Sequence, residues 1–219
     1  MSISKRVTKY WDTYDTSSIG VGAYTDEHLF NKYIQGDILE VGCGRGGRIG
    51  KINSFKTKTG IDPSTQAIND AKKHSPETNF VVGIAEKLPF PDDSFDFVYS
   101  LEVFEHVKQY ELMVSEMVRV LRGNGIGYIQ TPNYPAKRFY DFAYWLLRRR
   151  SDFKDDYTHV TKMSTFTLSK VISNHANVEY VSTRNILGGN FFPLNYLDKS
   201  SFLAKIIGQK SIVIFSKRG

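Results

Sequence analysis

Residues 37–47 read Asp-Ile-Leu-Glu-Val-Gly-Cys-Gly-Arg-Gly-Gly, and this stretch decides the fold. Its apolar part, residues 37–41, predicts a buried strand. Four of the next six residues are glycines, and residues 48–52 can then begin a helix. Glycine reaches positive φ without strain and lets a ligand approach the backbone closely. A strand, a glycine-rich turn and a helix start are typical of the nucleotide cradle of an open α/β sheet, so we expect an adenosine-bearing cofactor at the carboxyl end of this strand.

The glycine spacing permits two interpretations of this turn. Gly42, Gly44 and Gly47 fit the G-x-G-x-x-G pattern of dinucleotide sites such as those for NAD. Gly42, Gly44 and Gly46 instead fit G-x-G-x-G, with Glu40 two residues before the first glycine. This second pattern resembles motif I of the class I methyltransferases that use S-adenosylmethionine. Both cofactors carry an adenosine, so the rest of the chain must decide between them.

A carboxylate ends the next predicted strand. Residues 57–62 predict that strand, and Pro63 and a helix from Ser64 to about His74 follow it. A carboxylate at the tip of the second strand can accept hydrogen bonds from both ribose hydroxyls of a bound adenosine. Ser64 is the better helix cap, so Asp62 is predicted to bind the ligand.

The segment after the third predicted strand separates the two interpretations. Residues 79–83 predict that strand, and residues 97–100 predict a fourth. Between them, residues 85–96 read Ala-Glu-Lys-Leu-Pro-Phe-Pro-Asp-Asp-Ser-Phe-Asp. This resembles the signature of the small-molecule methyltransferases that include the ubiquinone and menaquinone biosynthesis enzymes, the type 11 family. Two strands joined by a polar loop without a crossover helix are not what a dehydrogenase needs. The chain therefore resembles a class I S-adenosylmethionine-dependent methyltransferase of that family.

The resemblance implies where S-adenosylmethionine binds. The carboxylate of Glu86, or the backbone beside it, would meet the adenine amino group, and residues 100–107 are where the methionine end of the cofactor meets the acceptor. Tyr14 would roof the cofactor, or else pack the N-terminal segment onto the sheet. Cys43 is predicted to be a small packed residue of the turn rather than a nucleophile. The predicted cofactor-binding residues are Glu40, Gly42, Cys43, Gly44, Gly46, Asp62, Pro63, Ala85, Glu86, Leu101 and Tyr14.

The predicted catalytic residues are two histidines. Methyl transfer from a sulfonium requires alignment of donor and acceptor but no metal, and the sequence has no Cys/His cluster with ligand spacing. A hydroxyl acceptor also needs a general base. His106, which follows the fourth strand, is the first candidate, and His159 is the second; the alternative for His106 is a structural role at a helix end. Glu102 and Glu105 are interpreted as solvent-facing charges.

The predicted fold is a Rossmann-like, doubly wound α/β sheet of seven strands with helices on both faces. Residues 178–184 and 211–216 predict the sixth and seventh strands, and the resemblance implies that the last strand is antiparallel. Two parts are expected along the chain. Residues 1–35 would form an N-terminal helical cap, and residues 36–219 a methyltransferase domain whose insert, residues 187–208, covers the site as a lid or forms a dimer contact.

Three helices carry further expectations. A helix over residues 25–35 would be capped by Thr25. A helix over residues 109–122 would stop at residues 123–125, Gly-Asn-Gly, which can adopt the left-handed conformation. A helix over residues 136–150 has apolar side chains on most sides, so one of its faces is left for a substrate, a second subunit or a membrane surface.

Composition limits the partners. A net charge of +6 is mild, and the single cysteine excludes an internal disulfide and fits a reducing, cytoplasmic location. The sequence shows neither a secretory signal nor an apolar run long enough for a membrane span, and no nucleic-acid-binding module. The expected acceptor is a small molecule, methylated on oxygen and apolar or lipid-linked; peripheral membrane contact and a homodimer are compatible with these features. The alternatives are an NAD-dependent oxidoreductase and a non-catalytic, methyltransferase-like binding protein.

Overall fold

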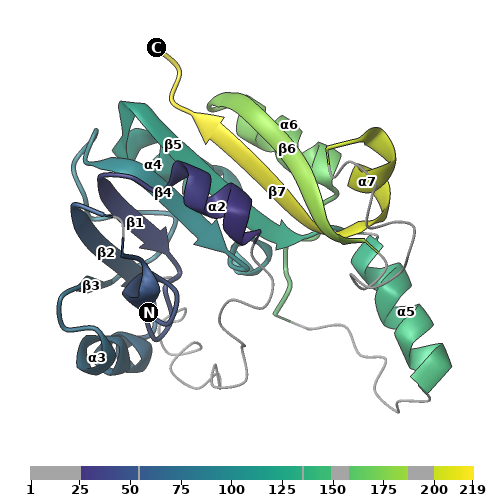
Figure 1. The fold of residues 1–219 in the computed structure, drawn as a ribbon, viewed down its shortest axis with the longest axis horizontal. Coiled ribbons are helices and arrows are strands. Elements are labelled where there is room, and N and C mark those ends of the chain that lie inside the picture. The colour runs from purple at the N-terminus through teal and green to yellow at the C-terminus, as the bar shows by residue number, and fades with distance from the viewer. Residues whose placement is uncertain (1–25, 54, 135, 149–157, 187–199) are drawn as a thin grey trace.

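We describe a computed structural model of the chain, which defines residues 26–53, 55–134, 136–148, 158–186 and 200–219. Seven strands form one sheet in the order β3-β2-β1-β4-β5-β7-β6 (Figure 1). Strands β1 to β5 run parallel, whereas β7 is antiparallel to both of its neighbours. This confirms the predicted Rossmann-like sheet with its last strand reversed. The strands are β1 (Asp37–Val41), β2 (Thr57–Asp62), β3 (Asn79–Val82), β4 (Phe95–Leu101), β5 (Leu121–Pro132), β6 (Asn177–Ile186) and β7 (Gly208–Ser216).

Helices cover both faces of this sheet (Figure 1). They are α2 (Glu27–Tyr33), α3 (Thr65–His74), α4 (Tyr110–Val120), α5 (Ala136–Arg148), α6 (Thr165–Ser173) and α7 (Phe202–Ile207), with short 3-10 helices η1 (Ile49–Lys51) and η2 (Phe104–His106). Alternate residues of a strand point to opposite faces, so β1 feeds two apolar cores: Ile38 packs with α2 and α3, and Leu39 with α4 and α6. The sheet is therefore buried on both sides, which leaves the strand ends for a binding site.

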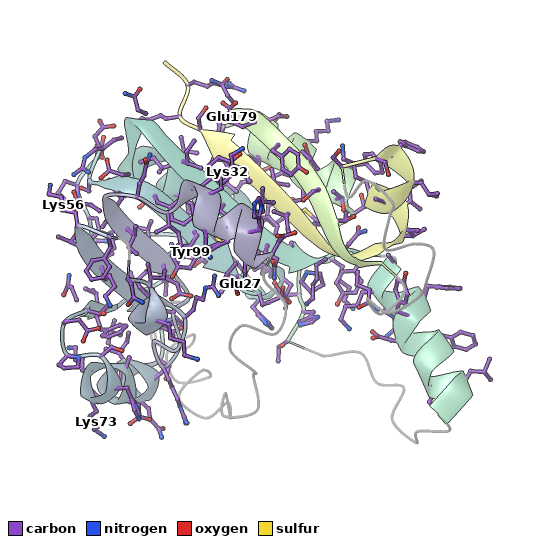
Figure 2. The ribbon with its side chains drawn as sticks, viewed as in Figure 1. Glu27, Lys32, Lys56, Lys73, Tyr99 and Glu179 are labelled. Carbon is purple, nitrogen blue, oxygen red and sulfur yellow. The ribbon has the colours of Figure 1, made fainter. Side chains whose placement is uncertain are left out.

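Helix α2 is fixed to the sheet by an aromatic cluster. The ring of Phe30 lies 5.5, 4.9 and 5.2 Å from the ring centroids of Phe97, Tyr99 and Tyr128, each edge to face. Figure 2 shows Tyr99 on the face of the sheet that α2 covers. Asp26, rather than the predicted Thr25, caps this helix, because its side chain accepts a hydrogen bond from the Leu29 N–H at 3.2 Å. The predicted Thr25 cap is thus wrong.

Helix α4 ends earlier than the sequence predicts. It stops at Val120; Leu121 is already extended and starts β5, where it pairs with Phe95. The predicted left-handed stop at residues 123–125 is therefore wrong, because both glycines lie inside a strand and neither has positive φ. Burial of Leu121 against the sheet overrides the local glycine signal. The helix expected at residues 48–52 is likewise only the single 3-10 turn η1.

The two expected appendages are only partly within the described residues. Residues 1–25 of the predicted N-terminal cap, which include Tyr14, lie outside them, as do residues 187–199 of the predicted lid. Helix α7 lies at the end of that insert and is capped by Ser201. Helix α5 extends away from the sheet (Figure 1), with Phe139, Phe142 and Leu146 exposed. In the part of the chain that the structure defines, we find no helix that combines the length and apolar character needed to cross a bilayer.

Candidate active site

The glycine turn after β1 adopts a conformation that requires glycine. Gly42, Gly44 and Gly46 have φ values of 78°, 51° and 74°, whereas Gly47 is not in the positive-φ region. A Cβ at Gly42 would lie 2.3 Å from the Val103 side chain, and one at Gly46 would lie 2.6 Å from the Phe80 ring. A Cβ at Gly44 would meet nothing within 4 Å. The strained positions are thus those of the G-x-G-x-G pattern, and the turn is open at Gly44.

Asp62 lies at the end of β2 and holds this turn. One carboxylate oxygen, Oδ2, accepts the Gly44 N–H at 2.8 Å, and Oδ1 accepts the Ser64 N–H at 2.9 Å. Ser64 in turn caps α3 by accepting the Ala67 N–H at 3.1 Å, as predicted. Each carboxylate oxygen has two lone pairs, so Asp62 can accept further hydrogen bonds from a ligand beside Gly44. The structure therefore brings the predicted ribose-binding carboxylate to the open side of the turn.

Cys43 and Arg48 fasten the turn to the rest of the fold. Cys43 is buried, and its N–H donates to the Ile61 carbonyl at 3.0 Å. Burial raises the pKa of its thiol, which disfavours a nucleophilic thiolate and supports the predicted packing role. The Arg48 guanidinium donates to both carboxylate oxygens of Glu27 at 2.6 and 2.9 Å and lies 4.4 Å above the Phe30 ring. Figure 2 shows Glu27 at the start of α2, which is thereby tied to the turn.

Glu40 is buried beneath the turn rather than exposed beside it. Its carboxylate accepts the Ile49 N–H at 3.2 Å and lies next to the Tyr99 hydroxyl in the core. Burial in this apolar environment raises the pKa of Glu40 to about 8. The side chain therefore supports the backbone that follows the glycines.

The pKa of Glu40 predicts a pH-dependent stability. The carboxyl of the folded protein keeps its proton up to about pH 8, whereas the same carboxyl in the unfolded chain ionises near pH 4.5. Unfolding then releases a proton, so the free energy of unfolding falls as the pH rises from about 5 to about 8, by on the order of 4 kcal/mol at most. Glu40→Gln keeps the acceptor for the Ile49 N–H but cannot titrate. Urea denaturation across this pH range should show a flatter dependence for the variant, and equal slopes for both proteins would contradict the assignment.

The loop between β3 and β4 contains the Leu-Pro-Phe part of the sequence signature. Glu116 accepts the Leu88 N–H at 2.7 Å, while Arg119 donates to the carbonyls of Leu88 at 3.0 Å and Phe90 at 2.9 Å. Residues 83–94 are all described and contain turns and one isolated bridge but no helix, as predicted. Four predicted cofactor-binding residues lie at or after the carboxyl ends of β2, β3 and β4. Of these, Ala85 is buried, whereas Pro63, Glu86 and Leu101 are half-buried.

The structure brings the two predicted catalytic histidines together. The rings of His106 and His159 lie 4.9 Å apart, although they are distant in the sequence. Nδ1 of His106 lies 3.1 Å from the Thr158 carbonyl, which can only accept a hydrogen bond, so this nitrogen carries the proton. The segment that carries His159 is held by the Thr161 N–H, which donates to the Glu105 carbonyl at 2.9 Å. The pair therefore depends on a tertiary contact.

Three residues near the histidines were not predicted as functional: Tyr134, Glu105 and Thr131. Nδ1 of His159 lies 2.6 Å from the Tyr134 hydroxyl. Glu105 was expected to face solvent, but only 2% of it is exposed, and it accepts a hydrogen bond from the Thr131 hydroxyl at 2.8 Å. Burial, with the nearby Glu102 carboxylate, raises the pKa of Glu105 to about 8. The solvent-facing prediction for Glu105 is thus wrong, because η2 turns this side chain toward β5.

Glu102 has an unusual backbone conformation at the end of β4. Its φ is 57°, which is uncommon for a residue with a side chain. Its N–H donates to the Gln130 carbonyl at 2.9 Å, and its carboxylate accepts from the Gln130 amide at 3.1 Å and pairs with Lys210. Strain of this kind occurs where surrounding contacts over-determine the backbone, often at functional sites.

Comparisons with known proteins agree with this geometry. Residues 39–129 match a family model described as a methyltransferase domain. A fatty-acid O-methyltransferase from Mycolicibacterium smegmatis is 34% identical over 113 residues, which cover 49% of this chain and 40% of that protein. A phthiotriol/phenolphthiotriol dimycocerosates methyltransferase from Mycobacterium tuberculosis is 38% identical over 93 residues, which cover 40% of this chain and 34% of that protein. The chain thus spans less than half the length of these curated relatives.

Solved structures agree on the fold. The crystal structure of a SAM-dependent methyltransferase from Thermotoga maritima matches with a TM-score of 0.65 at 19% identity, over 87% of this chain and 86% of that one. At this identity the likeness concerns the fold alone. The segment that matches the family model contains the Leu-Pro-Phe loop, the glycine turn and Asp62, and a hydrogen bond joins the last two. Residues 39–129 of this chain are therefore similar to a methyltransferase domain, in sequence and in fold.

Proposed function

We propose that this protein transfers a methyl group from S-adenosylmethionine to an oxygen atom of a small acceptor that is apolar or lipid-linked. The observation that carries the proposal is the hydrogen bond from the Gly44 N–H to Asp62, which places a carboxylate at the open side of a positive-φ glycine turn. In this arrangement the backbone at Gly44 lets the cofactor approach closely, and the carboxylate accepts hydrogen bonds from its ribose.

Two observations favour S-adenosylmethionine over NAD. The glycines with positive φ are Gly42, Gly44 and Gly46, which are the three of the G-x-G-x-G pattern. In addition, β3 and β4 are joined by a loop whose described residues contain no helix. The histidine pair argues against a non-catalytic binding protein, because it supplies a proton acceptor at the end of β4.

The chemistry of the proposed reaction is an in-line displacement. The acceptor oxygen attacks the methyl carbon, an O–C bond forms, and the C–S bond breaks with its electron pair going to sulfur. The protein contributes by holding the two reactants about 3–3.5 Å apart and aligned. For a hydroxyl acceptor, we propose that His106 takes the proton through Nε2, because its Nδ1 already donates to Thr158. Tyr134 would orient His159 as the second imidazole of the pair.

The proposed acceptor class rests on the relatives and on exposed apolar side chains. The two curated relatives named above act, by their names, on a fatty acid and on phthiotriol-type lipids. On this chain, α5 exposes Phe139 and Leu146, and α7 exposes Phe202 and Leu203. These surfaces would suit an apolar acceptor, although a homodimer contact or a membrane surface would use the same side chains, and both remain predictions. A cytoplasmic location also stays a prediction, supported by the single, unpaired Cys43.

A methyl-transfer assay tests the proposal. The full chain would be incubated with S-adenosylmethionine labelled on its methyl group and with separate sets of fatty acids, long-chain alcohols, quinols and glycans. We expect label in an apolar product from at least one of the first three sets, with S-adenosylhomocysteine formed in equal amount. Transfer only to glycans would reject the apolar acceptor, and the absence of both transfer and S-adenosylmethionine binding would reject the function.

A further inference from the structure

The histidine pair and the neighbouring Glu105 form a cluster of three possible metal ligands. Each of Glu105, His106 and His159 offers one donor atom, and these atoms all lie within 4.8 Å of one another. Donor atoms around a tetrahedral cation with bonds of about 2.1 Å are roughly 3.4 Å apart, so a closure of at most about 1.4 Å would complete the site. Rotation of exposed or half-buried imidazoles can supply this closure, and His106 and His159 are both half-buried.

We propose that Glu105, His106 and His159 form a binding site for one divalent transition-metal cation, such as Zn²⁺. Two imidazole nitrogens and one carboxylate oxygen are the ligand set of catalytic sites that keep a coordination position open for water or substrate. The ligands come from η2 and from the segment before α6, so the fold assembles the set only when these two parts of the chain meet.

Each ligand has a second partner that would orient it toward a cation. The Nδ1 atoms of His106 and His159 face the Thr158 carbonyl and the Tyr134 hydroxyl, at 3.1 and 2.6 Å. With both Nδ1 atoms engaged, Nε2 is the nitrogen that each imidazole would present. The Glu105 carboxylate accepts from the Thr131 hydroxyl at 2.8 Å. Outer partners of this kind set the tautomer and direction of metal ligands, and their loss typically weakens metal binding by about 10- to 100-fold.

Burial and charge also favour a cation at this place. Glu105 is 2% exposed, and a buried carboxylate is stable only when a positive charge or a proton compensates it. The ammonium group of Lys210 forms an ion pair with Glu102 and also acts electrostatically on Glu105. A divalent ion would neutralise Glu105 and attract the second carboxylate of Glu102 at longer range. The two carboxylates of Glu102 and Glu105 therefore favour a cation at this place over an anionic ligand.

A role of the cation in the reaction rests on the proposed methyl transfer, in which the metal would activate the acceptor. An acceptor hydroxyl in the open coordination position would lose its proton to solvent water more readily, because the metal stabilises the alkoxide. The oxygen would then attack the methyl carbon, and the C–S electron pair would stay on the sulfur of S-adenosylhomocysteine. In that case the imidazoles serve as ligands, and the metal replaces His106 as the group that activates the acceptor.

Metal binding can be measured without any substrate. The full chain would be freed of metal with a chelator and titrated with ZnCl₂ in a calorimeter and with Co²⁺ by visible absorption. We expect one molar equivalent to bind, and binding to weaken in Glu105→Gln and in His159→Ala by more than the roughly 10- to 100-fold that loss of an outer partner costs. His74→Ala, on the exposed end of α3, is the matched control and should bind like the wild type.

The outcomes separate this inference from the proposed function. If the wild type binds no stoichiometric Zn²⁺ or Co²⁺, or if Glu105→Gln and His159→Ala bind as tightly as the wild type, the metal site is refuted. Methyl transfer that persists in the chelator would then leave the proposed function standing. If instead the metal binds as described but S-adenosylmethionine does not, the metal site stands and the proposed function falls.

Discussion

Gly44→Ala is expected to weaken S-adenosylmethionine binding by about 10- to 100-fold, which corresponds to about 1–3 kcal/mol of steric cost at a closely packed contact. The φ of Gly44 is 51°, so an alanine there costs only about 1–2 kcal/mol of backbone strain. Its Cβ would meet no protein atom within 4 Å, so the variant should still fold. The methyl group would instead point into the space that we assign to the cofactor.

The matched control for this substitution is Gly123→Ala. Gly123 lies in β5, its φ is not positive, and its added Cβ would also meet nothing within 4 Å. Calorimetric titration and thermal unfolding should show that Gly44→Ala is folded but binds the cofactor poorly, whereas Gly123→Ala resembles the wild type. Equal affinities for Gly44→Ala and the wild type would mean that the cofactor does not contact the turn.

His106→Ala should reduce kcat for a hydroxyl acceptor by roughly 10²- to 10⁴-fold, the usual contribution of a positioned proton acceptor. His159→Ala should also reduce kcat, because its ring lies 4.9 Å from that of His106. The affinity for S-adenosylmethionine should not change, since neither histidine contacts the glycine turn in the hydrogen bonds of the described residues. A carboxylate acceptor is already ionised at neutral pH, so its methylation should depend far less on either histidine.

His175→Ala provides the comparison for these variants. His175 follows α6, and its N–H donates to the Ile172 carbonyl, away from the pair. Steady-state kinetics with one alcohol and one fatty acid would measure the effects. If His106→Ala and His175→Ala give the same kcat with the alcohol, His106 neither accepts the proton nor holds a metal that activates the acceptor.

The features that the sequence predicted correctly are determined by local patterns. The bounds of β1 and β2 follow directly from their apolar residues and from the glycines and proline that end them. The positions of Asp62 and Ser64 follow from the same local pattern, because one residue ends a strand and the other begins a helix. The folded protein keeps these local preferences because the tertiary contacts at the same positions agree with them.

The features that the sequence missed depend on tertiary contacts. A run of Gly-Asn-Gly predicts a helix stop, but pairing of Leu121 with Phe95 makes it part of β5. Glu105 has the spacing of a surface charge, yet η2 buries it against Thr131. The meeting of His106 with His159 requires the segment before α6 to bond to η2. No spacing in the sequence encodes that contact, so the ligand set of the proposed metal site could not have been found from the sequence.

The most direct test of the central claim is calorimetric titration of the wild-type protein with S-adenosylmethionine and, separately, with NADH. We predict that one molar equivalent of S-adenosylmethionine binds with micromolar or tighter affinity and that NADH gives no heat of binding. Binding of NADH together with silence toward S-adenosylmethionine would contradict the account of the turn and of Asp62.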